Sequence, residues 1–392
     1  MKRRKINEHV QWLGGVDWDR RLFDGLIPLP DGTSYNAYLI AGTEANVLVD
    51  TADPRMLDEL MRQLDGAPAP DYVVVQHAEQ DHSGSLPAVL ERYPDARVLT
   101  TPKGKAMLTE FLRLEDDRID TIEDGETLSL GDLTLEFAHM PWVHWPETMV
   151  TYLRELRMLF TCDFFGSHLA TSDLTVTDQA QVAEAAKRYY AEIMMPFRRM
   201  IDRNLDRLAD YEIDMIAPSH GPIYDQPGFI LEAYRSWVSD PPENKVVLPY
   251  ISMHGSTEVM VHHFVEALVA RGVTVQQFEL SVVDLGKLAM ALVDAGTLVL
   301  GTPTVLGGPH PQAAYAASLA TALRPKMKFA TVIGSYGWAG GAANKVAQTV
   351  KPLRLEVLDP VTCKGLPDDA DFAALDALAD TIAAKHKDAG FV

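Results

Sequence analysis

"VVVQHAEQDHSG", residues 73–84, is the stretch that says most about the fold of this chain. An apolar run typical of a buried strand ends here, and loops that follow strands are where α/β proteins commonly place their chemistry. Two imidazoles and two carboxylates stand within the next six residues: His77, Glu79, Asp81 and His82. A polar turn explains any one of them. Together they favour a metal site, either a hydrolytic zinc site or one built for another metal.

Length and composition indicate a two-domain globular protein. The 392 residues exceed the size at which one hydrophobic core usually keeps growing, and the 47% apolar and 23% charged residues are ordinary for a globular chain. No stretch approaches the roughly 20 apolar residues of a membrane span. The start, "MKRRKINEHVQW", has no apolar region behind its basic residues, so it is not a secretory signal. We expect a cytoplasmic protein.

Charge and cysteine content exclude further classes. The formal net charge of -20 disfavours nucleic-acid binding, which needs a basic surface. Cys162 and Cys363 are the two cysteines, and neither belongs to a CxxC pair. This argues against a disulfide framework, a zinc ribbon and a fused iron–sulfur module such as rubredoxin.

A joint between the two domains is predicted at "SDPPENK", residues 239–245, because adjacent prolines end a helix and cannot start a central strand. The predicted domains are therefore 1–240 and 245–392. In the first, short apolar runs alternate with turns and a few helices, which favours a mixed sheet or sandwich with helices outside: VLVD, DYVVVQ, DLTLEFAHM and MVTYLREL.

Downstream of the joint, strand and helix patterns take turns. The strands are expected in KVVLPYI, VTVQQFEL, GTLVLGTPT, KFATVIGSYG and LRLEVLDP, and the helices in TEVMVHHFVEALVARG, HPQAAYAASLATALRP, GAANKVAQTVKP and about 369–386. This alternation predicts a doubly wound parallel sheet of flavodoxin type.

Further metal-ligand types follow or precede other predicted strands. His144 lies in "PWVHWPET", Asp163 ends "MLFTCD", and His220 ends "IDMIAPSHG". His168, close to Asp163 in sequence, is a candidate for orienting a ligand or donating a proton. For the remaining histidines and for Tyr189 and Tyr190, a structural role is the simpler interpretation.

Three loops of the second domain are suited to a flavin nucleotide. "YISMHGSTEVM", residues 250–260, places hydroxyls and backbone N–H groups at a predicted helix N-terminus, which favours a phosphate, although a helix-capping turn is the plain alternative. No GxGxxG or P-loop pattern is present. "GTPTVLGGPHP" (301–311) and "GSYGWAGGA" (334–342) are glycine-rich loops that can approach a flat ring, and the second carries two aromatic side chains. The predicted FMN-binding residues are Ser252, Met253, His254, Gly255, Ser256, Thr257, Pro303, Thr304, Val305, Leu306, Ser335, Tyr336, Gly337, Trp338 and Gly340.

The metal residues resemble the HxHxDH signature of the metallo-β-lactamase superfamily, followed by a later His, Asp and His. Glu79 replaces the middle histidine, and a carboxylate added to imidazoles suits iron better than zinc. The resulting HxExDH pattern is similar to that of the flavodiiron proteins (A-type flavoproteins). "GTSYNAYLI" (32–40) and the three loops also resemble that family, so the likeness covers nearly the whole chain, although His254 stands where a tyrosine is common.

The resemblance implies an N-terminal αββα sandwich, two non-haem irons and FMN. It implies a first iron held by His77, Glu79 and His144, and a bridge through Asp163. It implies a second iron held by Asp81, His82 and His220, although the residue matching His82 is not a ligand in every member. His77, Glu79, Asp81 and Asp163 are the expected catalytic residues.

The implied activity is reduction of dioxygen to water, of nitric oxide to nitrous oxide, or of both. Electrons would come through FMN from rubredoxin or a similar small redox protein. A head-to-tail homodimer, or a dimer of such dimers, is implied as well, in the minimal two-domain class without a fused rubredoxin. Neither nucleic acid nor membrane is an expected partner.

Two other functions remain open from sequence. The first is a zinc hydrolase with an accessory flavodoxin-like domain, in which Asp81 would orient or deprotonate a metal-bound water. The second is a redox carrier or gas sensor without catalysis. Glu79 and the three flavin-type loops weigh against the hydrolase, and no appended signalling module supports the sensor.

Overall fold

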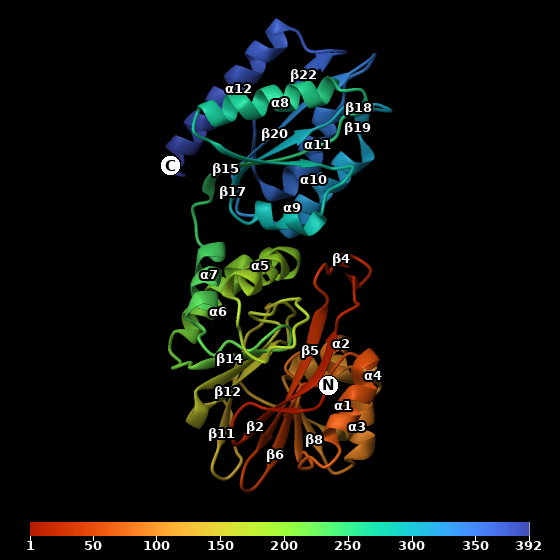
Figure 1. The fold of residues 1–392 in the computed structure, drawn as a ribbon, viewed down its shortest axis with the longest axis vertical. Coiled ribbons are helices and arrows are strands. Elements are labelled where there is room, and N and C mark those ends of the chain that lie inside the picture. Colours follow the sequence, from red (N-terminus) through yellow and green to blue (C-terminus); the bar gives the residue numbers. More distant parts are fainter. Residues whose placement is uncertain (392) are drawn as a thin grey trace. The chain divides into compact units, whose positions relative to one another are not determined.

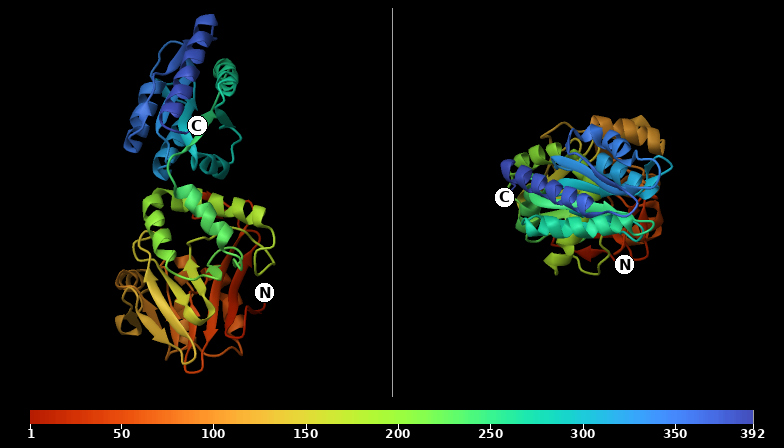
Figure 2. Two further views of the ribbon diagram at one scale, coloured as in Figure 1. Left: turned by 90° about the vertical axis from the view of Figure 1, so that its left-hand side faces the viewer. Right: turned by 90° about the horizontal axis from the view of Figure 1, so that it is seen from above.

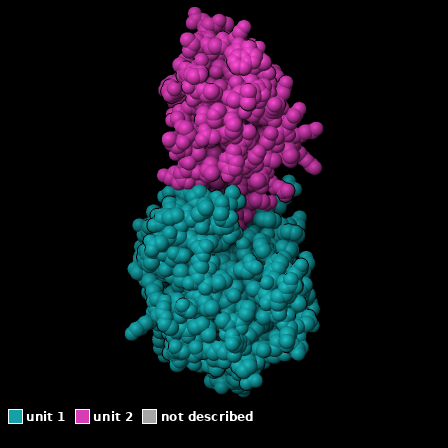
Figure 3. Space-filling view, turned by 90° about the vertical axis from the view of Figure 1, so that its right-hand side faces the viewer, with its two compact units in different colours: residues 1–190, 197–238 teal, residues 191–196, 239–392 magenta. Residues whose placement is uncertain are grey.

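The computed structural model describes residues 1–391. Its contacts divide the chain into two compact units, shown in different colours in Figure 3. Unit 1 comprises residues 1–190 and 197–238, and unit 2 comprises residues 191–196 and the chain from residue 239 onward. Among the described residues, no helix combines the length and apolar character needed to cross a membrane.

Unit 1 contains two sheets (Figure 1). The larger has the order β1-β2-β5-β6-β7-β8-β9, with parallel pairing from β6 to β9. Its strands are β1 Arg4–Lys5, β2 Val10–Asp17, β5 Thr33–Ala41, β6 Asn46–Val49, β7 Tyr72–Val74, β8 Arg97–Thr100 and β9 Ile119–Thr121. The smaller has the order β10-β11-β12-β13-β14: β10 Thr127–Ser129, β11 Thr134–His139, β12 Met149–Leu153, β13 Met158–Cys162 and β14 Met215–Pro218. β3 Leu22–Phe23 and β4 Ile27–Pro28 form a separate hairpin.

The helices of unit 1 flank these sheets. They are α1 Leu57–Leu64, α2 Gln80–Ser83, α3 Leu86–Arg92, α4 Pro102–Leu112, α5 Gln179–Tyr189, α6 Arg198–Leu208 and α7 Gly228–Val238. Alternation along β6 explains the layers: Val47 and Val49 join a core between the two sheets, whereas Leu48 joins a core beneath α1, α3 and α4. This arrangement confirms the expected αββα sandwich.

Unit 2 is built on one parallel sheet of order β16-β15-β17-β20-β21, with β22 also pairing β20. In chain order this is 2-1-3-4-5, the flavodoxin-like winding, as predicted. Its strands are β15 Glu243–Tyr250, β16 Thr274–Glu279, β17 Ala295–Gly301, β20 Phe329–Tyr336, β21 Glu356–Val357 and β22 Val361–Lys364, and β18 Thr304–Val305 with β19 Gly308–Pro309 forms a small hairpin.

Helices cover both faces of this sheet. They are α8 Ser256–Ala270, α9 Leu285–Leu292, α10 Pro311–Leu323, α11 Ala342–Val350 and α12 Asp369–Asp388. α8 and α12 run side by side on one face (Figure 2), and their apolar residues form a core with the central strands. α9, a short helix whose N-terminus is capped by the Asp284 side chain, was not expected from the sequence. One strand was expected over 353–360; the structure has the short β21 within that range and a second strand, β22, just after Pro360, which cannot donate a ladder hydrogen bond.

Candidate metal centre

The residues of the opening stretch lie at the carboxyl edge of the larger sheet. β7 ends at Val74, the next five residues form a loop that holds His77 and Glu79, and the one-turn helix α2 carries Asp81 and His82. The helix is tied to the sheet because Thr51 donates both its backbone N–H and its hydroxyl to the carbonyl oxygen of His82, at 2.8 and 2.5 Å. Histidines and carboxylates are therefore presented together at one end of the strands.

The three more distant residues reach the same place from the smaller sheet. β13 and β14 are parallel neighbours, with Cys162 opposite Pro218 in register. Asp163 and His220 directly follow these strands, so they emerge at one edge, and His144 lies in the loop between β11 and β12. The structure thus brings together all seven residues for which the sequence predicted metal ligation.

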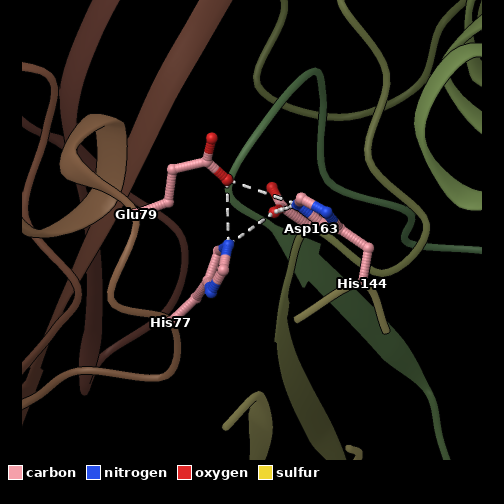
Figure 4. Close-up of side chains that lie close together, drawn as sticks. All are labelled: His77, Glu79, His144 and Asp163. Atoms are coloured by element: carbon pink, nitrogen blue, oxygen red, sulfur yellow. Dashed lines mark hydrogen bonds and ion pairs between the residues drawn. The ribbon is translucent and has the colours of Figure 1, made fainter. Parts of the chain in front are cut away.

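Figure 4 shows the first group, in which two imidazoles and two carboxylates converge. Glu79 Oε2 lies 3.0 Å from His77 Nε2 and 3.3 Å from His144 Nε2. Asp163 Oδ2 lies 3.1 Å from His144 Nε2 and 3.5 Å from His77 Nε2. Both histidines therefore turn the same ring nitrogen toward the two carboxylates.

The second group uses the other oxygen of Asp163. Its Oδ1 lies 3.0 Å from His82 Nε2 and 3.4 Å from His220 Nε2. Asp81 completes the group, with Oδ2 at 3.1 Å from His220 Nε2 and Oδ1 at 3.3 Å from His82 Nε2. A further set, His82, Cys162 and Asp163, also has its donor atoms within 4.8 Å of one another. Burial raises the pKa of the Cys162 thiol, so sulfur is the poorer donor for a hard ion.

The donor atoms suit two metal ions. The donor atoms of His77, Glu79, His144 and Asp163 lie within 4.8 Å of one another, and so do those of Asp81, His82 and His220. This is the spread expected for ligands that share an ion at about 2.0–2.3 Å. Asp163 Oδ1, His82 Nε2 and both carboxylate oxygens of Asp81 are buried and have no hydrogen-bond partner among the described residues. Unpartnered buried polar atoms are costly, and a bound cation would satisfy them.

The pKa values of the site residues also indicate that the site favours positive charge. Burial disfavours the charged form of His220, but the adjacent carboxylates of Asp163 and Asp81 outweigh it and raise the pKa of His220 to about 10. Burial acts to raise the pKa of Glu79, yet the two histidines of the first group hold it well below its usual range. The histidines around Asp163 likewise hold its pKa well below its usual range, against burial, so Glu79 and Asp163 are ionised. Metal cations would displace the protons that the imidazoles carry.

His168 lies beside the second group without joining it. Its ring centroid is 4.9 Å from that of His220 and 4.8 Å from that of Tyr189, and its Nδ1 is 2.9 Å from Thr33 Oγ1. Burial, followed by the charge of His220, lowers the pKa of His168, so this imidazole is neutral. Tyr189, for which a core position was expected, is buried next to the same histidines.

The β3–β4 hairpin also contributes to the site, although nothing in the sequence predicted it. The Phe23 ring is buried, with its centroid 5.1 Å from that of His168 and 6.4 Å from that of His220. Burial, then the charges of Glu79 and Asp81, raises the pKa of the adjacent Asp24. The hairpin lies some fifty residues before the HxExDH stretch and has no ligand-like spacing, so no sequence signal pointed to it.

The second unit holds a separate cavity of about 400 Å³ at the carboxyl ends of its strands. β15, β17 and β20 are in register there, since Tyr250 lies opposite Gly301 and Gly301 opposite Ile333. The loops after these strands, and the N-terminus of α8, line the cavity. This position, at the switch point of a doubly wound sheet, is where such folds bind ligands.

Thirteen of the fifteen predicted FMN residues line the cavity, and the two that do not are Gly255 and Gly340. Gly255 has a positive φ of 86° and directly precedes α8, so it shapes the loop rather than the wall. Gly365 lines the cavity and was not predicted, because it follows β22, an element that the sequence analysis did not separate.

Together, the fold and the site define a class of protein: a metallo-β-lactamase-like sandwich with a dinuclear, carboxylate-rich donor set, followed by a flavodoxin-like unit. The family model described as "ODP family beta lactamase" matches residues 33–221. The nitric oxide reductase of Moorella thermoacetica is 36% identical over 395 residues, covering 98% of each chain.

Solved structures give the same result. The rubredoxin oxygen:oxidoreductase from the anaerobe Desulfovibrio gigas matches with a TM-score of 0.95 at 30% identity over 100% of both chains. The flavodiiron protein from Giardia intestinalis matches with a TM-score of 0.89 at 26% identity over 98% of both. The chain belongs to the flavodiiron protein family, which confirms the resemblance seen in its sequence.

Proposed function

We propose that this protein is an oxidoreductase that passes electrons from an external donor through FMN to a di-iron site, where dioxygen is reduced to water, nitric oxide to nitrous oxide, or both. The observation that carries the proposal is that the two carboxylate oxygens of Asp163 face different histidine pairs. Its Oδ2 faces His77 and His144, and its Oδ1 faces His82 and His220. One carboxylate between two histidine pairs is an arrangement suited to a pair of metal ions.

In this proposal the first group, His77, Glu79, His144 and Asp163, would hold one iron, and Asp81, His82, His220 and Asp163 the other. When bound, the two irons would supply redox chemistry and sites for a diatomic substrate. The protein contributes ligand position and exclusion of water, since His77, His220 and Asp163 are each about 1% exposed. The inward-facing Nε2 of His82 supports its inclusion as a ligand.

FMN is proposed for the cavity of unit 2, and residues 245–392 are proposed as the FMN domain, with 1–240 as the di-iron domain. Hydroxyls of Ser252, Ser256 and Thr257 lie where a phosphate would meet the N-terminus of α8. The side chains of Tyr336 and Trp338 would cover the ring. The Trp338 side chain is 91% exposed, which leaves it available to a flavin or a second chain.

A head-to-tail homodimer would bring the FMN of one chain to the irons of the other, and a dimer of dimers is a larger form of the same assembly. Exposed apolar side chains at the cavity, Met253, Leu306 and Trp338, support burial against another protein surface. Rubredoxin is the proposed donor, because a matching solved structure is named for rubredoxin. A cytoplasmic location is proposed with it.

The position of Glu79 argues against the alternative function, a zinc hydrolase. It places an additional carboxylate 3.0 Å from His77 in a position where a histidine-rich zinc site would have an imidazole. Metal and flavin analysis of the purified protein tests both functions. We expect about two irons and one FMN per chain, and gas consumption with a reduced donor. Zinc without flavin would refute the reductase, and iron and flavin without gas consumption would indicate a carrier or sensor.

A further inference from the structure

Glu147 is a buried carboxylate directly behind the first metal group. It lies in the loop before β12, and its side chain is 0% exposed. Its Oε1 accepts a hydrogen bond from His77 Nδ1 at 2.6 Å and one from the backbone N–H of Ala78 at 3.0 Å. Its Oε2 is buried and has no hydrogen-bond partner among the described residues. Glu147 therefore holds both the imidazole ring of His77 and the backbone of the loop that carries it by hydrogen bonds.

Fold stability does not account for this carboxylate. Burying an ionised carboxylate carries a desolvation penalty of several kcal/mol, and a neutral glutamine could accept the same two hydrogen bonds through its amide oxygen. The unpartnered Oε2 adds to the cost. We therefore expect the negative charge of Glu147 to have a function that a neutral side chain would perform less well.

The geometry around His77 indicates what the charge of Glu147 does. When Nδ1 donates to Glu147, the other nitrogen, Nε2, is left to bind a metal, and Nε2 is the atom that faces Glu79 at 3.0 Å and Asp163 at 3.5 Å. A carboxylate behind a histidine ligand fixes its tautomer and ring orientation and increases its basicity. Trp145 packs edge-on against the same ring, with centroids 4.9 Å apart.

In the second group, the ligand that corresponds to His77 is His220, and the hydrogen-bond partner of its second ring nitrogen within residues 1–391 is uncharged. His220 Nδ1 lies 2.6 Å from the backbone carbonyl oxygen of Ser34, which is a neutral acceptor. The two groups are thus supported differently, His77 by an anion and His220 by an amide. A difference of this kind predicts different affinities for the same metal ion.

We propose that Glu147 is a positioning residue that orients His77 and strengthens metal binding at the first group specifically. This inference rests on the proposed function, because it requires His77 to be a metal ligand. Loss of such an outer partner typically lowers metal affinity 10- to 100-fold. The effect is expected at the first group alone, since the hydrogen bonds that the Glu147 side chain accepts within the described part of the chain come from His77 and Ala78.

The test uses the full-length apo protein in two backgrounds, each with one group disabled. His220→Ala leaves the first group, and His144→Ala leaves the second. Ferrous ion alone is the probe, titrated anaerobically against a chelator. Glu147→Ala should weaken binding 10- to 100-fold in the His220→Ala background and less than about twofold in the His144→Ala background. Glu147→Gln, which keeps an acceptor oxygen, should recover part of the loss.

Glu155→Gln is the matched control, because Glu155 also accepts a backbone N–H, that of Thr134 at 2.8 Å, but lies on the surface away from the site. It should change neither affinity. Equal losses in both backgrounds, or none in the first, would overturn the inference. If circular dichroism shows that Glu147→Ala does not fold, Glu147→Gln decides by the same comparison. If the unsubstituted chain binds fewer than two ferrous ions, the proposed function fails instead.

Discussion

Asp163→Asn is the substitution that should affect both metals at once. The carboxylate places Oδ2 3.1 Å from His144 and Oδ1 3.0 Å from His82, so it is the one side chain shared by the two donor groups among the described residues. An asparagine has the same shape but only one oxygen. Its NH₂ group must face one of the two groups, where it cannot ligate a cation.

The expected loss of metal affinity in Asp163→Asn follows from the two oxygens serving different groups. The group that meets the NH₂ loses a ligand, and the group that keeps an oxygen loses the charge. Even outer partners of metal ligands are worth 10- to 100-fold in affinity, so we expect at least about 100-fold at each group, which corresponds to about 2.8 kcal/mol. Glu79→Gln should instead affect the first group alone, because the metal-facing oxygen of Glu79, Oε2, lies against His77 and His144, both of the first group.

The assay is iron per folded chain after anaerobic reconstitution and gel filtration. The unsubstituted protein should hold about two irons, Glu79→Gln about one, and Asp163→Asn close to none. FMN content, measured on the same samples, should stay constant, since the flavin cavity lies in the other unit. One tightly held iron in Asp163→Asn would refute the bridging role.

Three further results are expected. Glu79→His should shift metal preference toward zinc and abolish gas reduction, measured by metal analysis and a gas electrode. Burial lowers the pKa of His386 to about 4, below its ordinary 6.5, so the folded state favours the neutral ring. Stability contributed by His386 should therefore be present above pH 6.5 and be lost, by roughly 1–3 kcal/mol, as pH falls toward 4, as urea unfolding would show. Ser256→Ala with Thr257→Ala should weaken FMN binding about tenfold or more, measured by flavin fluorescence.

Each of these has a contrary outcome. Full gas reduction in Glu79→His would mean that Glu79 is not a ligand. A His386→Gln variant that keeps the same slope of stability against pH would assign that slope to other groups. Unchanged FMN affinity in the double alanine variant would move the phosphate away from α8, and Thr381→Ala, on the exposed side of α12, serves as its control.

Much of the fold could be predicted because its signals are local. Val47, Leu48 and Val49 form a continuous apolar run, which is typical of a strand covered on both faces. Strand and helix alternation after residue 243 predicted the parallel order of unit 2. The short helix α9 and the split between β21 and β22 were missed, because brief elements carry weak periodicity.

The candidate ligand residues could also be selected from the sequence, since they lie in loops or short turns that follow or precede strands and metal ligands come from few residue types. Their assignment to two groups was not. It depends on where each carboxylate oxygen points, and the separation of Asp163 Oδ1 from Oδ2 is a property of the packed loops.

Two units, the candidate ligands of the HxExDH pattern and the family could all be inferred from the order of the residues. The converging atoms, the packing of Phe23 and Tyr189 at the site and the hydrogen bond from His77 to Glu147 became visible in the folded chain. The physical reason is that strand patterns and ligand types are set by neighbouring residues. Contacts such as Glu147 to His77 span 70 residues and exist only once the two sheets have packed together.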